Sequence, residues 1–277
     1  MITLLIKEGS SKKYYILCDI EGAASLTCWD EARSANACYA PMAREMALEA
    51  AAAARGLFSG GADEVVIEDM HGDGCNIDCA LLPKDARLLR GITHDIVGLT
   101  GIFDESYDGV LMVGFHDAAS APGNPTSHTM VSSRIFRLTV NGALWGEFEM
   151  YAHAAAYRGV PTLFASGDEG VCAAAARTVP GLLTVPTKSG HGYGVLTKTP
   201  ELVREEIEGM MAKAVAAAKT ATPPALPDHF HVEITYVHHY DAYGCSHYPG
   251  ASLISPTTVA FDADDYGDVL RFFYFVI

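Results

Sequence analysis

The chain has 277 residues, of which 49% are hydrophobic, so it can bury a large core and an intrinsically disordered protein is excluded. Its formal net charge of -15 at pH 7 disfavours nucleic acid and anionic membranes as partners, because both bind through Lys and Arg side chains. A small or cationic partner fits this charge better, and the length predicts roughly two domains.

The sequence indicates a cytoplasmic protein. Its N-terminus, MITLLIKEGSSKK, lacks the basic start and the small-residue cleavage site of a secretion signal. No apolar run approaches the ~18 residues that mark a membrane span. An odd number of scattered cysteines in a chain of this size is typical of reduced thiols. The seven are Cys18, Cys28, Cys38, Cys75, Cys79, Cys172 and Cys245.

Three apolar segments in the first half of the chain are typical of buried strands, and each is followed by acids or a histidine. Between the first two, Pro41–Arg55 predicts a helix, because it begins with Pro and ends before Gly56. The strands are Tyr14–Cys18, followed by Asp19-Ile20-Glu21-Gly22; Glu64–Ile67, followed by Glu68-Asp69-Met70-His71; and Gly109–Phe115, followed by His116.

The second half begins with a predicted hairpin, because Asn141-Gly142 separates two β-prone segments, the second of which leads to Glu147. A further strand at Pro161–Ala165 precedes an Ala-rich helix. After Pro180 the composition changes, with Gly-rich and Pro-rich segments between the predicted elements. We expect a Gly-rich loop at 189–194, a helix at 200–219, a Pro-rich linker at 222–227, strands at 231–236 and 257–261, and a helix from Asp265.

Strands that alternate with helices predict an α/β fold with a Rossmann-like sheet and helices on both faces. We expect this metal-binding catalytic domain to cover residues 1–190, and a smaller C-terminal α+β domain to cover residues 191–277. Ligands in such sheets bind beyond the carboxyl ends of the strands, where the acids and histidines follow. Because side chains alternate along extended backbone, Asp19 and Glu21 project to the same side.

Five of these side chains form a candidate metal site. Hydrolysis of an amide by a Lewis acid requires oxygen and imidazole ligands, an open coordination position and a group that transfers protons. Five ligands exceed the needs of one tetrahedral zinc and predict two ions that share a bridging carboxylate. Asp19 is the candidate bridge, because it directly follows the first strand. The candidate ligands are Asp19, Glu21, His71, His116 and Glu147.

Other reactive groups carry alternative interpretations that the sequence disfavours. His71, Cys75 and Cys79 could contribute to a structural zinc site, but a fourth ligand and the usual Cys spacing are missing. Cys18 could be a nucleophile, but a cysteine in an apolar strand usually packs as a small hydrophobe. A C-terminal group lacks a neighbouring run of carboxylates and is interpreted as surface or interface: His229, His231, His238, His239 and His247.

Several motifs occur in a fixed order from about Tyr15 onward. They are Cys18-Asp19-Ile20-Glu21-Gly22; Glu68-Asp69-Met70-His71; Gly114-Phe115-His116 with Pro122-Gly123 and Ser127-His128-Thr129-Met130; and Asn141-Gly142 with Gly146-Glu147. The ordered set resembles the M55 D-aminopeptidases, also called the DppA or dipeptide-transport-protein family. The D-x-E-G motif is weak alone, whereas the ordered set is specific.

The resemblance implies a zinc-dependent aminopeptidase that acts on short peptides with a free N-terminal D-residue such as D-Ala. It also implies a ring-like homodecamer whose sites face an inner channel. A non-catalytic dipeptide-binding protein and a metallohydrolase of another small amide are the alternatives. The resemblance implies that His128 is catalytic and that two zinc ions are bound by Asp19, Glu21, His71, His116 and Glu147.

Some positions differ from the family pattern. Cys18 replaces a Ser, Glu149 and Tyr151 stand where the family has Gly and Asn, and the His191–Gly194 loop lacks an Arg. We expect Glu149 to supply a counter-charge for the substrate ammonium and Tyr151 to reshape the space for the first side chain. Because an exposed apolar tail would be hazardous on a monomer, Phe272–Ile277 also predicts a symmetric oligomer.

Overall fold

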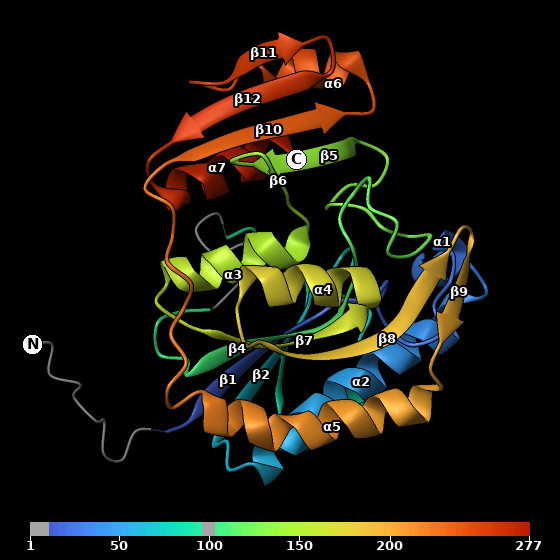
Figure 1. Ribbon diagram of the computed structural model, residues 1–277. Coiled ribbons are helices and arrows are strands. Elements are labelled where there is room, and N and C mark those ends of the chain that lie inside the picture. The colour runs from blue at the N-terminus through green and yellow to red at the C-terminus, as the bar shows by residue number, and fades with distance from the viewer. Residues whose placement is uncertain (1–10, 96–102) are drawn as a thin grey trace, which may run out of the picture.

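Two β-sheets organise the computed structural model, which describes residues 11–95 and 103–277 (Figure 1). Residues 1–10 lie outside this description. They make up most of the N-terminal segment in which the sequence predicts no secretion signal. Within the described residues, no helix combines the length and the apolar character that a membrane crossing requires.

The first sheet has seven strands in the order β3-β2-β1-β4-β7-β8-β9, and all neighbours are parallel except β8 and β9. β1 and β4 are almost entirely buried, as strands covered on both faces are. The strands are β1 (Lys13–Cys18), β2 (Glu64–Asp69), β3 (Arg87–Leu89), β4 (Gly109–Phe115), β7 (Thr162–Asp168), β8 (Leu183–His191) and β9 (Gly194–Thr197).

Helices cover both faces of this sheet, which confirms the predicted fold class (Figure 1). α2 (Tyr39–Ser59) and α5 (Pro200–Ala217) cover the face that presents Ile16, while α3 (Glu147–Tyr157) and α4 (Glu169–Thr178) cover the face that presents Leu17. This division follows from the alternation of side chains along β1. Two short helices, α1 (Trp29–Ala32) and the 3₁₀ helix η1 (Cys79–Leu81), lie in connecting segments.

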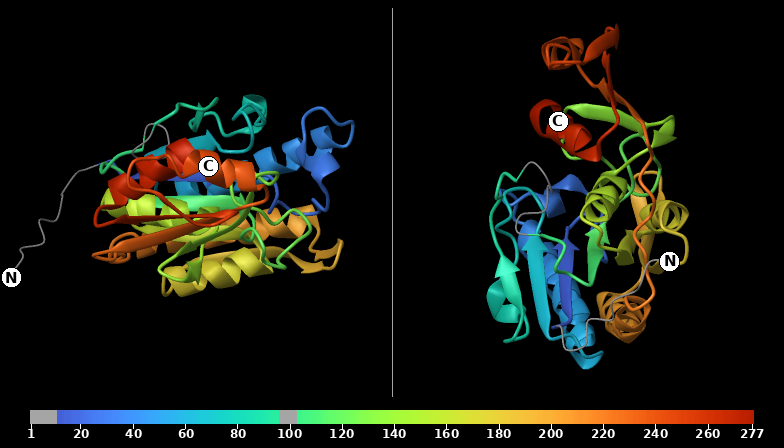
Figure 2. Two further views of the ribbon diagram at one scale, coloured as in Figure 1. Left: turned by 90° about the horizontal axis from the view of Figure 1, so that it is seen from above. Right: turned by 90° about the vertical axis from the view of Figure 1, so that its left-hand side faces the viewer.

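The second sheet has five strands in the order β11-β12-β10-β5-β6. Its core includes α7 and part of α3, so it lies on the α3 side of the first sheet (Figure 2). The elements are β5 (Ile135–Val140), β6 (Ala143–Leu144), β10 (Phe230–Tyr236), α6 (His239–Cys245), β11 (Ser252–Ser255), β12 (Thr258–Ala263) and α7 (Tyr266–Val276).

The two sheets do not follow each other along the chain. β5 pairs with β10, although about ninety residues separate them, and β6 pairs with β5 at the edge of the same sheet. By contrast, β9 and α5 pack with the first sheet. The boundary predicted at residue 190 falls inside β8. The division into domains at residues 1–190 and 191–277 therefore stays a prediction, and the sheets themselves divide the chain at other positions.

Two local expectations are corrected by the structure. Residues 189–194 form the end of β8, a turn and the start of β9, because their backbone hydrogen bonds pair the two strands. The C-terminal helix was expected to need an oligomer to cover it. Instead Phe272, Phe273 and Val276 are buried in the core beneath the second sheet, and Phe275 is exposed.

Candidate metal centre

The candidate site lies where the order of the first sheet reverses. From β1 the chain moves to β2 and β3 on one side, then returns to β4 and β7 on the other. The loops that leave β1 and β4 in opposite directions open a crevice beyond their carboxyl ends. Asp19 directly follows β1, and His116 directly follows β4.

Two glycines allow the loop after β1 to lie against β4. Gly22 donates its N–H to the carbonyl of Gly114 (2.7 Å), and Asp19 donates its N–H to the carbonyl of Val113 (2.9 Å). A Cβ atom at Gly22 would lie 1.7 Å from the carbonyl oxygen of Phe115. The glycine of the D-x-E-G motif is therefore required by close backbone contact, and it fixes the position of Asp19 and Glu21.

Two buried polar side chains, those of Lys188 and Glu49, hold the rest of this loop. The Lys188 ammonium donates to the carbonyls of Glu21 (2.6 Å), Ala23 (3.0 Å) and Leu26 (2.6 Å). The Glu49 carboxyl accepts the N–H of Ala24 (2.7 Å). Both side chains are buried, so water does not compete for these hydrogen bonds. Together they hold the loop that carries Glu21.

Glu49 makes stability depend on pH. Burial, which outweighs the bond from Ala24, raises the pKa of Glu49 to about 8. The folded chain therefore keeps a proton that the unfolded chain loses above its ordinary pKa of about 4.5. The free energy of unfolding falls between these two pH values by on the order of a few kcal/mol. Glu49→Gln removes this loss, so the variant is expected to gain stability over the parent as pH rises.

Urea unfolding of both proteins at about pH 5 and about pH 8 measures this effect. An equal difference between them at both pH values would show that Glu49 ionises normally in the folded state.

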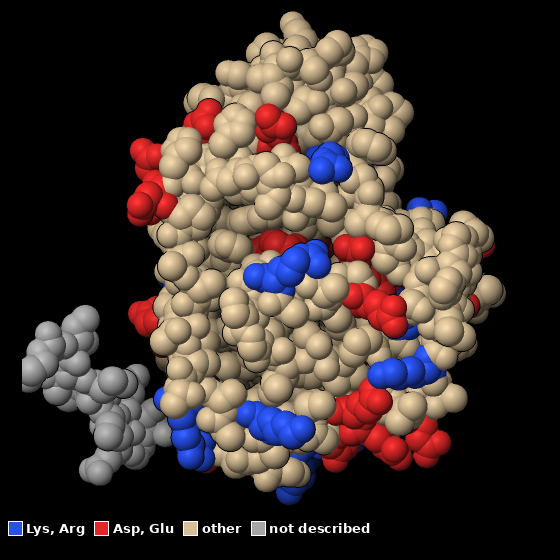
Figure 3. All heavy atoms as spheres, in the orientation of Figure 1, with Lys and Arg blue, Asp and Glu red and all other residues tan. Residues whose placement is uncertain are grey.

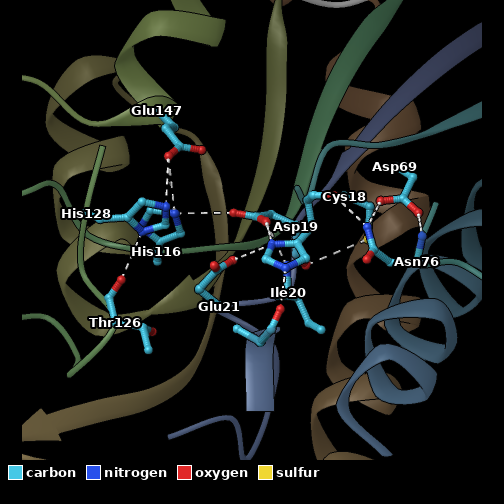
Figure 4. A network of polar contacts seen from close by, with 12 residues as sticks. Cys18, Asp19, Ile20, Glu21, Asp69, Asn76, His116, Thr126, His128 and Glu147 are labelled. Atoms are coloured by element: carbon cyan, nitrogen blue, oxygen red, sulfur yellow. Dashed lines mark hydrogen bonds and ion pairs between the residues drawn. The ribbon is translucent and has the colours of Figure 1, made fainter. Parts of the chain in front are cut away.

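All five candidate side chains belong to one network of contacts centred on Asp19 (Figure 4). The His71 Nδ1 atom lies 3.3 Å from Asp19 Oδ1 and 3.1 Å from Glu21 Oε2. The His116 Nε2 atom lies 3.3 Å from Asp19 Oδ2 and 3.5 Å from Glu147 Oε1. Each oxygen of Asp19 therefore faces a different imidazole, and Asp19 lies between two groups of ligand atoms.

The far nitrogen of each imidazole has a backbone partner. His71 Nε2 lies 2.6 Å from the carbonyl of Ala32, and His116 Nδ1 lies 3.0 Å from the carbonyl of Asp117. A carbonyl only accepts, so the nitrogen facing it carries the proton. In the neutral imidazole the other nitrogen then has the lone pair, and it faces the carboxylates, which is how metal-binding histidines are oriented.

The electrostatics fit a cation at this position. Burial raises the pKa of Asp19, but the bonds to His116 and His71 outweigh it and hold that pKa well below its ordinary value. Burial lowers the pKa of His71, but Asp19 and Glu21 raise it to about 11. The cluster thus attracts positive charge strongly. Among the described residues, Glu21 Oε2 and His116 Nε2 are buried and make no hydrogen bond of good geometry, although charged groups lie close to both, and a metal ion would satisfy them.

His128 lies beside this cluster, on the loop that follows β4. Its ring stacks on His116 with centroids 4.1 Å apart, and its Nε2 atom lies 3.7 Å from Glu147 Oε1. Its Nδ1 atom lies 3.0 Å from the carbonyl of Thr126. His128, His116 and Glu147 present ligand atoms within 4.8 Å of one another. His128 is therefore placed either to transfer protons or to complete a ligand set.

Asp69 and Asn76, which the sequence did not single out as site residues, hold the loop that carries His71. The Asp69 carboxylate accepts the N–H groups of Asn76 (2.6 Å) and Ile77 (2.7 Å) and the Asn76 side-chain amide (2.8 Å). The same amide donates to the carbonyl of His71 (2.5 Å). In the sequence, Asp69 was visible only as a member of the Glu68-Asp69-Met70-His71 segment that follows the predicted strand at Glu64–Ile67.

Asp69→Ala is expected to loosen the His71 loop and to weaken metal binding about 10–100-fold, as loss of a partner that orients a ligand does. Asp78→Ala is the matched control, because Asp78 lies on the same loop, is exposed and caps only η1. Competition with a chelator measures both affinities. Equal affinities in the two variants would mean that Asp69 does not position His71.

A pocket of about 690 Å³ opens onto the cluster. Its walls come from most of the cluster, from α1 and the residues that follow it, from the loop after β2 and from the C-terminal helix α7. Glu68 and Tyr151 also line it. The pocket therefore joins the first sheet to an element of the second, and the walls include Trp29, Arg33, Met70, Gly72, Phe273, Tyr274 and Ile277.

The departures from the family pattern fall in different places. Tyr151 lines the pocket as expected. Glu149 was expected to supply a counter-charge there, and that is wrong. It is buried, accepts the N–H of Gly146 (2.8 Å) at the start of α3 and the hydroxyl of Thr178 (3.3 Å), and does not line the pocket. The exposed turn at Gly192 also lies outside the pocket walls.

The alternative sites are not assembled among the described residues. Cys75 and Cys79 are exposed free thiols, and neither belongs to a group that could hold a metal. Burial raises the pKa of the Cys18 thiol well above its ordinary value, so Cys18 packs as an inert side chain. His229 and His231 form exposed ion pairs with Asp262 on the neighbouring strand β12, which the sequence did not indicate.

The fold and the cluster together define a class. A Rossmann-like sheet that binds nucleotides has a glycine-rich phosphate loop after β1. Here that position holds two carboxylates that face two imidazoles, an arrangement of the kind found in α/β metallohydrolases.

The chain belongs to the M55 peptidase family, described as D-aminopeptidase, whose model matches residues 12–275. It is similar to a D-aminopeptidase of Bacillus subtilis (strain 168), with 26% identity over 255 residues that cover 91% of this chain and 92% of the relative. Among solved structures it is similar to "Zn-dependent D-aminopeptidase DppA from Bacillus subtilis, a self-compartmentalizing protease". That match has a TM-score of 0.87 and 25% identity, and it covers 94% of this chain and 95% of that chain. The family resemblance seen in the sequence is confirmed.

Proposed function

We propose that this protein is a zinc-dependent aminopeptidase that hydrolyses short peptides with a free N-terminal D-residue such as D-Ala. The observation that supports this most strongly is the position of Asp19, whose two oxygens each face a different imidazole at 3.3 Å. Membership of a family described as D-aminopeptidase, and the Zn-dependent relative of the same fold, support the substrate class and the metal.

The five candidate residues would hold two zinc ions, with Asp19 shared between them. His71 contacts one oxygen of Asp19 and also Glu21, while His116 contacts the other oxygen of Asp19 and also Glu147. The ligand atoms of Asp19, Glu21 and His116 also lie within 4.8 Å of one another. When bound, zinc supplies a Lewis acid for the scissile carbonyl and makes water a stronger acid. Two orphaned ligand atoms, Glu21 Oε2 and His116 Nε2, support this assignment independently of the family.

His128 would transfer protons during the reaction. Its Nδ1 atom faces the carbonyl of Thr126, so Nε2 is the nitrogen that exchanges a proton with the reacting groups. Trp29 contacts the His128 ring edge-on, with centroids 5.1 Å apart, and limits its rotation. Asp19, Glu21 and His116 are buried, which strengthens the electrostatic interactions among them.

A panel of three dipeptides tests the proposal under zinc-replete conditions: D-Ala-D-Ala, L-Ala-L-Ala and N-acetyl-D-Ala-D-Ala. We expect cleavage of D-Ala-D-Ala alone at a substantial rate. Equal or faster cleavage of the L-peptide would contradict D-specificity, and cleavage of the acetylated peptide would leave a general metalloamidase. Binding of D-Ala-D-Ala without cleavage would indicate a peptide-binding protein instead.

A homo-oligomer, with a homodecamer as the family resemblance implies, is part of this proposal. The top of the face in Figure 3, over β11, β12 and α6, is almost free of charged side chains. Exposed apolar groups occur on these elements, including Leu253, Ile254, Tyr240 and Tyr243. Such surface favours contact between copies. Light scattering that showed a stable monomer at micromolar concentration would remove this part.

We place the protein in the cytoplasm. All seven cysteines are free thiols, including the exposed Cys38, Cys75 and Cys79, as in a reducing compartment. Cell fractionation with compartment markers tests this placement.

A further inference from the structure

Glu68 is a buried carboxyl group of the pocket that the five candidate ligands do not explain. It is the fifth residue of β2, its side chain is 4% exposed, and it lines the pocket that opens onto the cluster. One of its oxygens, Oε2, accepts the hydroxyl of Tyr15 (2.8 Å). Among the described residues, nothing donates a hydrogen bond to its other oxygen.

Strand pairing places Glu68 on the same sheet face as Asp19. Glu68 lies opposite Leu17 in the parallel pairing of β1 with β2, and Leu17 shares a face with Asp19 two residues further on. Two residues along a strand and one strand across put the two Cα atoms roughly 8 Å apart. Tyr151 lies near both, because the carboxylates of Glu147, Glu68 and Asp19 each raise its pKa in addition to burial.

The charge of the loaded site favours a further acid beside the substrate amine. Under the proposed function, and before any water at the zinc ions would ionise, two zinc dications would outweigh the three carboxylates of Asp19, Glu21 and Glu147 by one positive charge. That excess would repel the substrate ammonium. The ammonium must nevertheless enter the site, because its nitrogen lies only ~2.5 Å from the scissile carbonyl carbon of the same residue. Glu149, the acid expected for this task, faces away from the pocket. Of the remaining acids on the wall, Glu68 is buried, while Asp73 and Asp95 lie nearer to solvent.

We infer that Glu68 binds the N-terminal ammonium of the substrate, with Tyr15 holding the carboxylate in place. This inference rests on the proposed aminopeptidase function and deepens it, because it assigns the group that recognises a free N-terminus. Tyr15 is held in turn by edge contacts of its ring with Phe103 and Tyr107. Burial raises the pKa of Glu68 to about 7, and an ammonium bound beside it favours the ionised form.

The test compares the zinc-loaded parent with Glu68→Gln. KM and kcat are measured for D-Ala-D-Ala, and the inhibition constant is measured for N-propionyl-D-Ala, which is the same dipeptide without its amine. We expect KM to rise about 10–100-fold in the variant, as for loss of one charged hydrogen bond, with little change in kcat. The inhibition constant of N-propionyl-D-Ala is expected to stay the same.

Glu45→Gln is the matched control, because Glu45 is a buried carboxylate paired with Arg204 and lies outside the pocket walls. Its KM is expected to equal that of the parent, and both variants are expected to keep the parental zinc content. If Glu68→Gln changes neither the KM for D-Ala-D-Ala nor the inhibition constant of N-propionyl-D-Ala, or changes both by the same factor, Glu68 does not recognise the ammonium. If the zinc-loaded parent cleaves no free-amine dipeptide, the proposed function fails, and this inference fails with it.

Discussion

Asp19→Ala is expected to lose both metal ions and to lower hydrolysis of D-Ala-D-Ala by at least a factor of about 1,000, or ~4 kcal/mol of transition-state stabilisation. Each oxygen of Asp19 contacts a different imidazole, so the substitution removes a ligand atom from both sides of the cluster. Asp19→Asn keeps one oxygen and is expected to retain at most one ion. Elemental analysis of the purified variants measures the metal content.

Asp63→Ala is a suitable control for these variants, because Asp63 is exposed and lies just before β2, away from the cluster. Its carboxylate accepts the backbone N–H of Lys12. It is expected to keep the parental metal content and activity. Parental metal content in Asp19→Ala would overturn the assignment of Asp19 as the shared ligand.

His128→Ala is expected to keep both metal ions and to lose about 10²–10⁴-fold in kcat, which is the usual contribution of a general acid-base group. His128 does not contact Asp19, so the five-ligand set is complete without it. Steady-state kinetics together with elemental analysis separates the two effects. His191→Ala, at an exposed position on the β8–β9 turn, provides the control for loss of an imidazole.

Two other results for His128→Ala are informative. Turnover close to that of the parent would show that His128 is a loop residue with no role in proton transfer. Loss of metal together with activity would make His128 a ligand, as its position within 4.8 Å of His116 and Glu147 permits.

The sequence predicted much of the site because polar side chains follow apolar strands. Asp19 and His116 occupy the first positions after β1 and β4, where parallel strands end at the same edge of the sheet. Their proximity follows from that topology. Metal binding by the five residues stays a prediction, although the structure brings the ligand atoms of each to within 3.1–3.5 Å of a neighbour in the set.

Other features depended on contacts that no local pattern carries. Glu149 stands two residues after Glu147, but a helix turns its side chain away from the pocket to cap α3. Glu68 reaches the pocket because β2 pairs with β1, which is a long-range contact. In the second sheet β5 pairs with β10, and the segments between them in the chain include strands of the first sheet. The extent of the second sheet therefore could not be predicted from consecutive segments.

Titration of the metal-free protein with zinc, while hydrolysis of D-Ala-D-Ala is followed, tests the two-metal aminopeptidase most directly. The metal-free protein is expected to be inactive, and activity is expected to rise until two zinc ions per chain are bound and then to stay constant. Full activity without zinc, full activity at one ion per chain, or none at two would contradict the two-metal site around Asp19.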